Sequence, residues 1–116
     1  MVDVTRQQAL ELWRNAVVAS VKGDTPDLSQ RQMAVMLTVY MSAPPHTVRG
    51  LADLLGISKP AVTRALDRLG SFGLVKRKVD ENDRRSVLIQ RTVKGSVFLS
   101  DFAGVVMDGA KAVDSE

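Results

Sequence analysis

Two short amphipathic segments, separated by about three residues, constrain the fold of this chain more than any other feature. The first, TVRGLADLLG, begins at Thr47, whose hydroxyl is suited to cap a helix, and ends at Gly56, a residue type that commonly terminates one. The second, ISKPAVTRALDRLGSFG, has Ser58 as its cap and closes at Gly73. A turn this short sets two helices across one another, so the spacing predicts a helix-turn-helix.

Two strand-like runs and a polar segment follow the second helix. The runs read LVKRKV and SVLIQRT, and DENDRR lies between them. A polar tip between two runs rich in β-branched residues is typical of an antiparallel hairpin. The sequence therefore predicts a presented helix followed by a presented basic loop, the combination expected of a protein that reads double-stranded DNA.

Positive charge is concentrated in this part of the chain. Between Gly56 and Ser96 the sequence has ten basic and four acidic residues, a net charge of +6. Since the whole chain carries +3, the remaining residues sum to −3. Such a distribution is expected of a phosphate-binding surface. The alternative is a merely solvated charged face, but the coincidence with helix-turn-helix spacing favours DNA.

The helical period divides the second helix, residues 58–72, into two sides. The side expected to pack in the core carries Val62, Leu66, Leu69 and Phe72. The opposite side presents Pro60, Thr63, Arg64 and Asp67, flanked by Lys59 and Arg68. A helix in the major groove reads bases mainly with its first turns, so we predict base contacts from Lys59, Thr63 and Arg64. Ser58 and Arg68 are predicted to bind phosphate. Each residue taken singly also fits an ordinary solvent-facing position.

At the tip of the hairpin, Asp83 and Arg85 lie two residues apart. Their side chains can pair on an extended or turning backbone, and the carboxylate would then hold the guanidinium in one direction. An oriented arginine suits the narrow minor groove of DNA, where the negative potential is strongest. The tip is therefore a candidate minor-groove contact.

Two further helices are predicted before this module. The first, about residues 5–21, has one apolar stripe formed by Leu10, Trp13, Val17 and Val21. The second, about residues 29–42 with Ser29 as its cap, is apolar nearly all round and is expected to lie centrally in the core. The Pro44–Pro45 pair ends this helix.

A last helix is predicted from a cap at Thr92 to about Val113. One of its apolar stripes consists of Phe98, Phe102 and Val105, and the other of Leu99, Val106 and Val113. A helix that is apolar on two faces needs two partners, which we interpret as its own domain and a second subunit. The alternative is that both stripes pack within the chain.

The sequence lacks the motifs of several kinds of site. It has no Cys, hence no disulfide framework, no thiolate nucleophile and no Cys-based zinc site. Its one His, His46, has no recognisable partner ligands, and there is no nucleophile–base pair or glycine-rich phosphate loop. We therefore expect neither enzyme activity nor a metal or cofactor. No apolar run approaches the roughly 18 residues of a membrane span, and the N-terminus lacks a signal pattern, so we expect a cytoplasmic protein.

Taken together, LADLLGISKPAVTRALDRLGSFGLVKR, then DENDRRSVLIQRT and the KG just after it, resemble the winged helix-turn-helix of the MarR-type bacterial transcription regulators. The most specific part is the D-x-x-D-R-R wing followed by the apolar return strand and T-x-K-G. The resemblance implies that helix 58–72 reads the major groove, and that wing 76–91 places Arg85, partnered by Asp83, in the minor groove.

The same resemblance implies a homodimer formed through the N- and C-terminal helices. It also implies release of DNA on binding small phenolic or lipophilic compounds, although no residue of this chain identifies an effector. Two departures stand out. The chain is short, with one C-terminal helix where the family usually has a longer pair, and Gly50 occupies a helix-interior site where a charged residue is common.

We therefore predict one winged helix-turn-helix domain over residues 1–116, mainly α with a small two-stranded antiparallel wing. Its DNA-binding core is expected at 28–95, with flanking helices at 3–22 and 93–113. The predicted DNA-binding residues are Ser58, Lys59, Pro60, Thr63, Arg64, Arg68, Lys76, Arg77, Asp83, Arg84 and Arg85. The expected function is sequence-specific regulation of transcription on double-stranded DNA, without a membrane partner. The alternative is a winged-helix module that binds an acidic protein.

Overall fold

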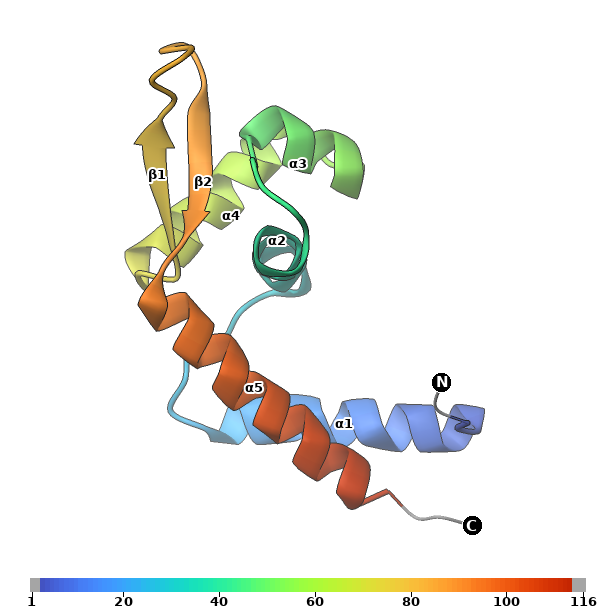
Figure 1. The fold of residues 1–116 in the computed structure, drawn as a ribbon. Helices are drawn as coiled ribbons and strands as arrows, with labels where there is room; N and C mark the ends of the chain where they lie inside the picture. The colour runs from blue at the N-terminus through green and yellow to red at the C-terminus, as the bar shows by residue number, and fades with distance from the viewer. Residues whose placement is uncertain (1–2, 114–116) are drawn as a thin grey trace. The chain divides into compact units, whose positions relative to one another are not determined.

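The computed structural model describes residues 3–113, which form five helices and a two-stranded sheet (Figure 1). In chain order the elements are α1 Arg6–Lys22, α2 Gln30–Met41, α3 Val48–Leu55, α4 Lys59–Ser71, β1 Val75–Val79, β2 Val87–Arg91 and α5 Val93–Lys111. They divide into two compact units, one covering Leu28–Val97 and one combining α1 with the part of α5 from Phe98 onward. The predicted fold class, mainly α with an antiparallel wing, is confirmed.

Helices α2 to α5 begin at the capping residues that the sequence predicts. The hydroxyl oxygen of each cap accepts a hydrogen bond of 2.9–3.2 Å from the backbone N–H three residues further on. These caps are Ser29, Thr47, Ser58 and Thr92. Each satisfies a backbone donor that the helix itself leaves unpaired, a contribution of about 1 kcal/mol. Gly50, which lies within α3 as predicted, donates one of these bonds from the first turn of the helix.

The ends of α3 and α4 require glycine. Gly56 follows α3 with φ 66°, and Gly73 follows α4 with φ 73°, both in the left-handed region that side chains disfavour. Beyond α4, the N–H of Gly73 donates to the Gly70 carbonyl and the N–H of Leu74 donates to the Leu69 carbonyl, both at 2.9 Å. This pair of bonds turns the chain sharply from α4 into β1.

The core of the unit Leu28–Val97 lies between α2, α3, α4 and the base of the wing. Its largest fully buried side chains are Val35, Met36, Val39, Leu51, Val62, Leu66, Leu69 and Leu74. The predicted central position of α2 and the predicted buried side of α4 are therefore confirmed, with one exception. Phe72 is only half-buried, because α4 ends before it and its ring lies beneath the Arg68 guanidinium, 4.6 Å from the ring centroid.

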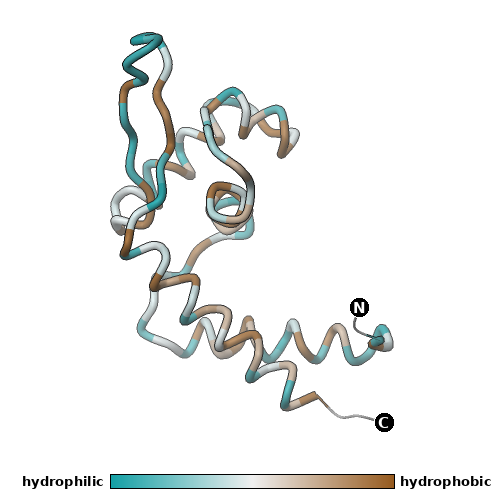
Figure 2. The backbone as a smooth tube through the Cα atoms, viewed as in Figure 1, coloured by the Kyte–Doolittle hydropathy of each residue, from teal (hydrophilic) through white to brown (hydrophobic). Residues whose placement is uncertain are grey.

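The wing is a two-stranded antiparallel ribbon with Val75 opposite Arg91 and Arg77 opposite Ile89. Residues directly opposite one another point to the same face of a sheet, and Val75 and Ile89 are buried, so this face is directed to the core. The Ile89 N–H donates to the His46 carbonyl at 2.8 Å, which anchors β2 to the segment before α3. Figure 2 shows the tip of the ribbon as its most hydrophilic part.

A compact hydrogen-bond network joins the base of the wing to α2 and to the start of α5. The Tyr40 hydroxyl donates to the Leu74 carbonyl at 2.6 Å and accepts from the Thr92 N–H at 3.0 Å. The Thr92 hydroxyl donates to the Gly73 carbonyl at 2.7 Å. A Cβ atom at position 95 would collide with both the Tyr40 hydroxyl and the Leu74 carbonyl, so this network requires Gly95.

The second unit is built on close approach between α1 and α5. Ala16 is fully buried, and the Asn15 side-chain amide donates to the Gly109 carbonyl at 3.0 Å. A Cβ at Gly109 would lie 3.2 Å from the Leu12 carbonyl oxygen, so a small residue is needed there. By contrast, the predicted apolar stripe of α1 is exposed along its length: Leu10, Trp13, Val17 and Val21.

Candidate nucleic-acid interface

The exposed face of α4 carries the residues that the sequence assigns to base reading. Five residues of α4 are buried: Ala61, Val62, Ala65, Leu66 and Leu69. The same helical period leaves Lys59, Thr63 and Arg64 exposed over the first turns. Pro60 fits the first turn because a proline lacks the N–H that would be unpaired there. The structure thus brings the predicted base-reading residues together on one exposed surface.

Two predicted phosphate contacts are held in place by α4 itself. The Ser58 oxygen accepts the N–H of Ala61 at 3.2 Å, which leaves its hydroxyl proton as a donor. Arg68 stacks on the Phe72 ring, an arrangement that restrains the guanidinium, while the residue as a whole stays exposed. Both ends of the exposed face therefore present hydrogen-bond donors.

The predicted pairing of Asp83 with Arg85 is present at the wing tip. Asp83 Oδ1 lies 3.1 Å from the Arg85 backbone nitrogen and 3.4 Å from Arg85 Nε. Asp83 Oδ2 accepts from the Ser86 hydroxyl at 3.4 Å, so one carboxylate organises the turn and the guanidinium together. The Arg85 side chain is 94% exposed, and its two terminal nitrogens remain available as donors.

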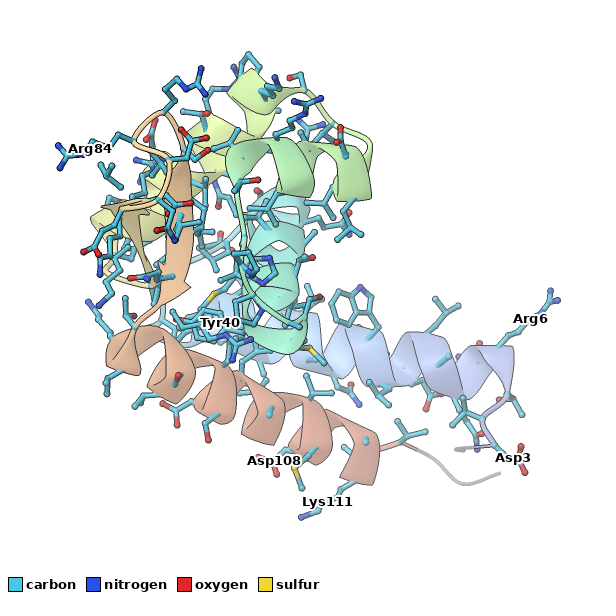
Figure 3. The ribbon with its side chains drawn as sticks, turned by 45° about the horizontal axis from the view of Figure 1, so that its top comes forward. Asp3, Arg6, Tyr40, Arg84, Asp108 and Lys111 are labelled. Atoms are coloured by element: carbon cyan, nitrogen blue, oxygen red, sulfur yellow. The ribbon has the colours of Figure 1, made fainter. Side chains whose placement is uncertain are left out.

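The other predicted wing cations differ in their surroundings. Arg84 extends from the tip away from the rest of the chain (Figure 3). Lys76 lies opposite Gln90, and because neighbours on a strand point to opposite faces, its side chain points away from the face that carries Arg77. Arg84 and Lys76 are therefore exposed, as a phosphate contact requires.

Arg77 is engaged within the protein. Its Nη2 lies 2.8 Å from Asp67 Oδ1 and also donates to the Thr63 carbonyl at 3.3 Å. The sequence predicted Arg77 as a DNA contact and assigned Asp67 only to the exposed side of α4. Their pairing joins β1 to α4 across 10 positions of sequence.

Two residues that shape the site escaped the sequence predictions. Arg91, counted there as part of the basic surface, donates from Nε to the Val39 carbonyl at 3.0 Å and from Nη2 to the Ser42 carbonyl at 2.9 Å. It thereby caps the C-terminal end of α2, where cations are favourable. Tyr40 anchors the wing base. The sequence feature related to this role is Gly95, three residues after Thr92, where a side chain would collide with the Tyr40 hydroxyl.

His46 has a structural position. It is buried, its backbone bonds β2, and Nε2 lies 3.2 Å from the Ser42 carbonyl oxygen. Over residues 3–113, no three His, Cys, Asp or Glu side chains lie close enough together to hold a metal ion. No helix in that range is long and apolar enough to cross a membrane.

A short turn between α3 and α4, an exposed basic helix and a basic hairpin define a winged helix-turn-helix protein. The chain belongs to the MarR family, whose model matches residues 28–87, just over half of the chain. That match covers α2, α3, α4, β1 and the first residue of β2. Family membership and the structural neighbours support a DNA-binding transcription regulator.

Several solved structures share the fold. A MepR mutant from S. aureus has a TM-score of 0.77 at 21% identity, covering 94% of this chain and 81% of that one. The transcriptional repressor CouR, solved bound to a 23-mer DNA duplex, has a TM-score of 0.70 at 28% identity, covering 89% of this chain and 70% of that one. The transcriptional regulator BldR from Sulfolobus solfataricus has a TM-score of 0.65 at 25% identity, covering 87% of this chain and 68% of that one.

Proposed function

We propose that this protein is a sequence-specific transcription regulator that places α4 in the major groove of double-stranded DNA and wing 76–91 in the minor groove. The observation that carries the proposal is the oriented, exposed Arg85 at the tip of a wing that follows an exposed basic helix. A major groove admits a helix, and a narrow minor groove attracts an inserted arginine.

The residues divide into base-reading and positioning contacts. Lys59, Thr63 and Arg64 lie on the first turns of α4, from which recognition helices reach base edges. Donors to phosphate are supplied around them by Ser58, Arg68, Lys76 and Arg84. The similarity to CouR, a repressor solved on a DNA duplex, supports the same mode of binding for this chain.

We further propose that the protein acts as a homodimer. The apolar stripe of α1 is exposed in the single chain, and contiguous exposed apolar surface on a small protein marks an interaction site. A two-fold symmetric dimer binds two half-sites, so the DNA it selects should itself be symmetric.

The decisive experiment selects bound duplexes from a random pool and reads the enriched sequence. A two-fold symmetric motif is expected, and binding to unselected duplex should weaken steeply as salt rises, because each phosphate contact releases counterions. Failure to enrich any sequence, together with a flat salt response, would reject the proposal. It would favour the alternative of a module that binds an acidic protein.

A further inference from the structure

The ion pair between Asp67 and Arg77 is the feature from which we draw a further inference. It joins the middle of α4 to the middle of β1, with Nη2 and Oδ1 2.8 Å apart, and the same nitrogen bonds the Thr63 carbonyl. The Arg77 side chain is 39% exposed and the Asp67 side chain 61% exposed. The pair therefore borders the proposed DNA-binding surface while tying two of its elements together.

The other attachments of the wing are concentrated at its base, where Arg91 of β2 bonds the Val39 and Ser42 carbonyls. At its base, Val75 and Ile89 are buried, and the Ile89 N–H bonds His46. Beyond Val75 every residue of β1 is exposed. Among the described side chains of β1, the one with a hydrogen bond to α4 is Arg77. A two-stranded ribbon is not stable by itself, so its direction depends on such attachments.

A small change in the direction of the wing displaces its tip by a distance that is large for a hydrogen bond. Asp80 lies three residues beyond Arg77, and at the rise of a strand this is roughly 10 Å. A tilt of roughly 15° at Arg77 would move the tip by roughly 3 Å, the length of one hydrogen bond. Arg85 and the base-reading face of α4 would then no longer match both grooves at once.

The pair also removes an electrostatic obstacle. Asp67 is the one acidic residue of α4, and it lies on the exposed face that is proposed to approach DNA. An unpaired carboxylate there would repel phosphate groups. Arg77 neutralises it without extending into the groove, since Nη2 is already bonded to Asp67 and Thr63.

We propose that Arg77 is a positioning residue, and that its ion pair with Asp67 sets the direction of the wing relative to the recognition helix. This inference rests on the proposed DNA-binding function. It changes the role predicted for Arg77 from a direct DNA contact to a support, and it makes Asp67 a determinant of specificity although a carboxylate is a poor neighbour for phosphate.

The test measures two dissociation constants for each variant, one for the duplex selected from the random pool and one for unselected duplex. Their ratio reports specificity. Asp67→Ala should lower this ratio roughly fivefold, the factor that corresponds to about 1 kcal/mol for an exposed ion pair. Binding to unselected duplex should strengthen, because a negative charge has been removed. A direct phosphate contact by Arg77 predicts instead that both affinities rise together.

Arg77→Gln should lower the ratio by the same factor, because the shorter amide cannot reach Asp67. Combined with Asp67→Ala, it should lower the ratio no further, since both changes remove one interaction. Lys78→Gln is the matched control: it removes a cation from the same strand, on the opposite face, and should weaken both affinities equally. Arg77→Lys keeps the charge and should restore part of the ratio.

Thermal melting of each variant checks that the fold is intact: a cooperative transition is expected, with the melting temperature lowered by a few degrees at most, as the loss of one exposed ion pair allows. An unchanged ratio in Asp67→Ala, or additive effects in the double variant, would overturn the positioning role. If the unmodified protein selects no sequence, the proposed function fails and this inference fails with it. If it selects a sequence but the ratios do not respond, only the positioning role is lost.

Discussion

At the scale of single residues, short-range geometry decides what the charged groups can do. Asp83 shows this most clearly, because its Oδ1 bonds both the backbone and the side chain of Arg85 while Oδ2 bonds Ser86. Once the carboxylate has formed the turn, it also limits the directions that the guanidinium can take. The entropy that an exposed arginine would lose on binding is thereby reduced in advance.

The effects of substitutions at Asp83 and Arg85 on DNA affinity should therefore be non-additive. Arg85→Ala should weaken binding to the selected duplex severalfold or more without affecting the fold, because the side chain is exposed. Asp83→Ala should cause part of the same loss by freeing the guanidinium. The double variant should bind scarcely worse than Arg85→Ala alone, as a titration of all three against one duplex would show.

Arg84→Ala provides the control for charge at the tip. It should cost less and act mainly through the salt-dependent part of binding, because Arg84 extends away from the chain. Fully additive effects of Asp83 and Arg85 would contradict the view that they act as a unit.

Gly95 offers a second prediction at this scale. Gly95→Ala should lower the free energy of unfolding by about 1–3 kcal/mol, since the added methyl group would displace the Tyr40 hydroxyl and the Leu74 carbonyl. Chemical denaturation measures the change. Adding Tyr40→Phe removes one of the two obstructing groups and should recover part of the loss expected from the separate changes. A Gly95→Ala variant as stable as the parent would show that the Tyr40 hydroxyl and the Leu74 carbonyl can move aside without a cost in stability.

At the scale of elements, the helices combine local signals with close packing. In α5, a Cβ at Gly104 would meet no atom within 4 Å, whereas one at Gly109 would lie 3.2–3.3 Å from Leu12, Asn15 and Ala16. Glycine disfavours a helix equally at both positions, but the two glycines have different surroundings. Only Gly109 is explained by the approach of another helix.

Alanine at these two positions should separate the effects. Gly104→Ala should stabilise the protein by about 0.5–1 kcal/mol through helix propensity alone. Gly109→Ala gains the same propensity but must push α1 aside, so its net effect should be smaller or destabilising. Thermal unfolding of the two variants side by side provides the comparison, and equal gains would contradict close packing at Gly109.

In α4, the exposed residues of the first turns lead to a prediction about which DNA bases the protein recognises. Arg64→Ala should cost about 1–3 kcal/mol of binding and relax the preference at one base pair per half-site. Repeating the selection with the variant would reveal the relaxed position. A uniform loss across all sequences would instead identify Arg64 as a phosphate contact.

The signals that predicted these elements act over a few residues, and this explains what the sequence revealed. The caps at Ser29 and Thr47 bond three residues ahead, and the Asp83–Arg85 pair spans two. Contacts that depend on tertiary position gave no such pattern. Tyr40 meets Thr92 across 52 residues, and Arg77 meets Asp67 only because β1 folds back along α4. Identical residue types thus receive different roles according to where the backbone brings them.

At the scale of the whole molecule, the exposed stripe of α1 makes the oligomeric state testable. Val17 belongs to that stripe and Val18 does not, yet their exposures are nearly equal at 41% and 43%. Val17→Lys should yield a folded monomer in sedimentation analysis, because a buried unpaired charge would prevent association. Val18→Lys, the control, should remain a dimer. An unmodified protein that is monomeric at high micromolar concentration would remove the dimer proposal.

The unequal environment of the two wing strands has a consequence for solubility. In the described sheet β1 pairs only with β2, so one of its edges is open, whereas β2 is also bonded to His46. Open strand edges are templates for pairing with other chains, and charged side chains oppose such growth. β1 places Lys76, Arg77 and Lys78 in succession along that edge. Lys76, which is proposed to bind phosphate, and its neighbours Arg77 and Lys78 therefore also protect the chain against edge-to-edge aggregation, and β-branched apolar replacements there would promote it.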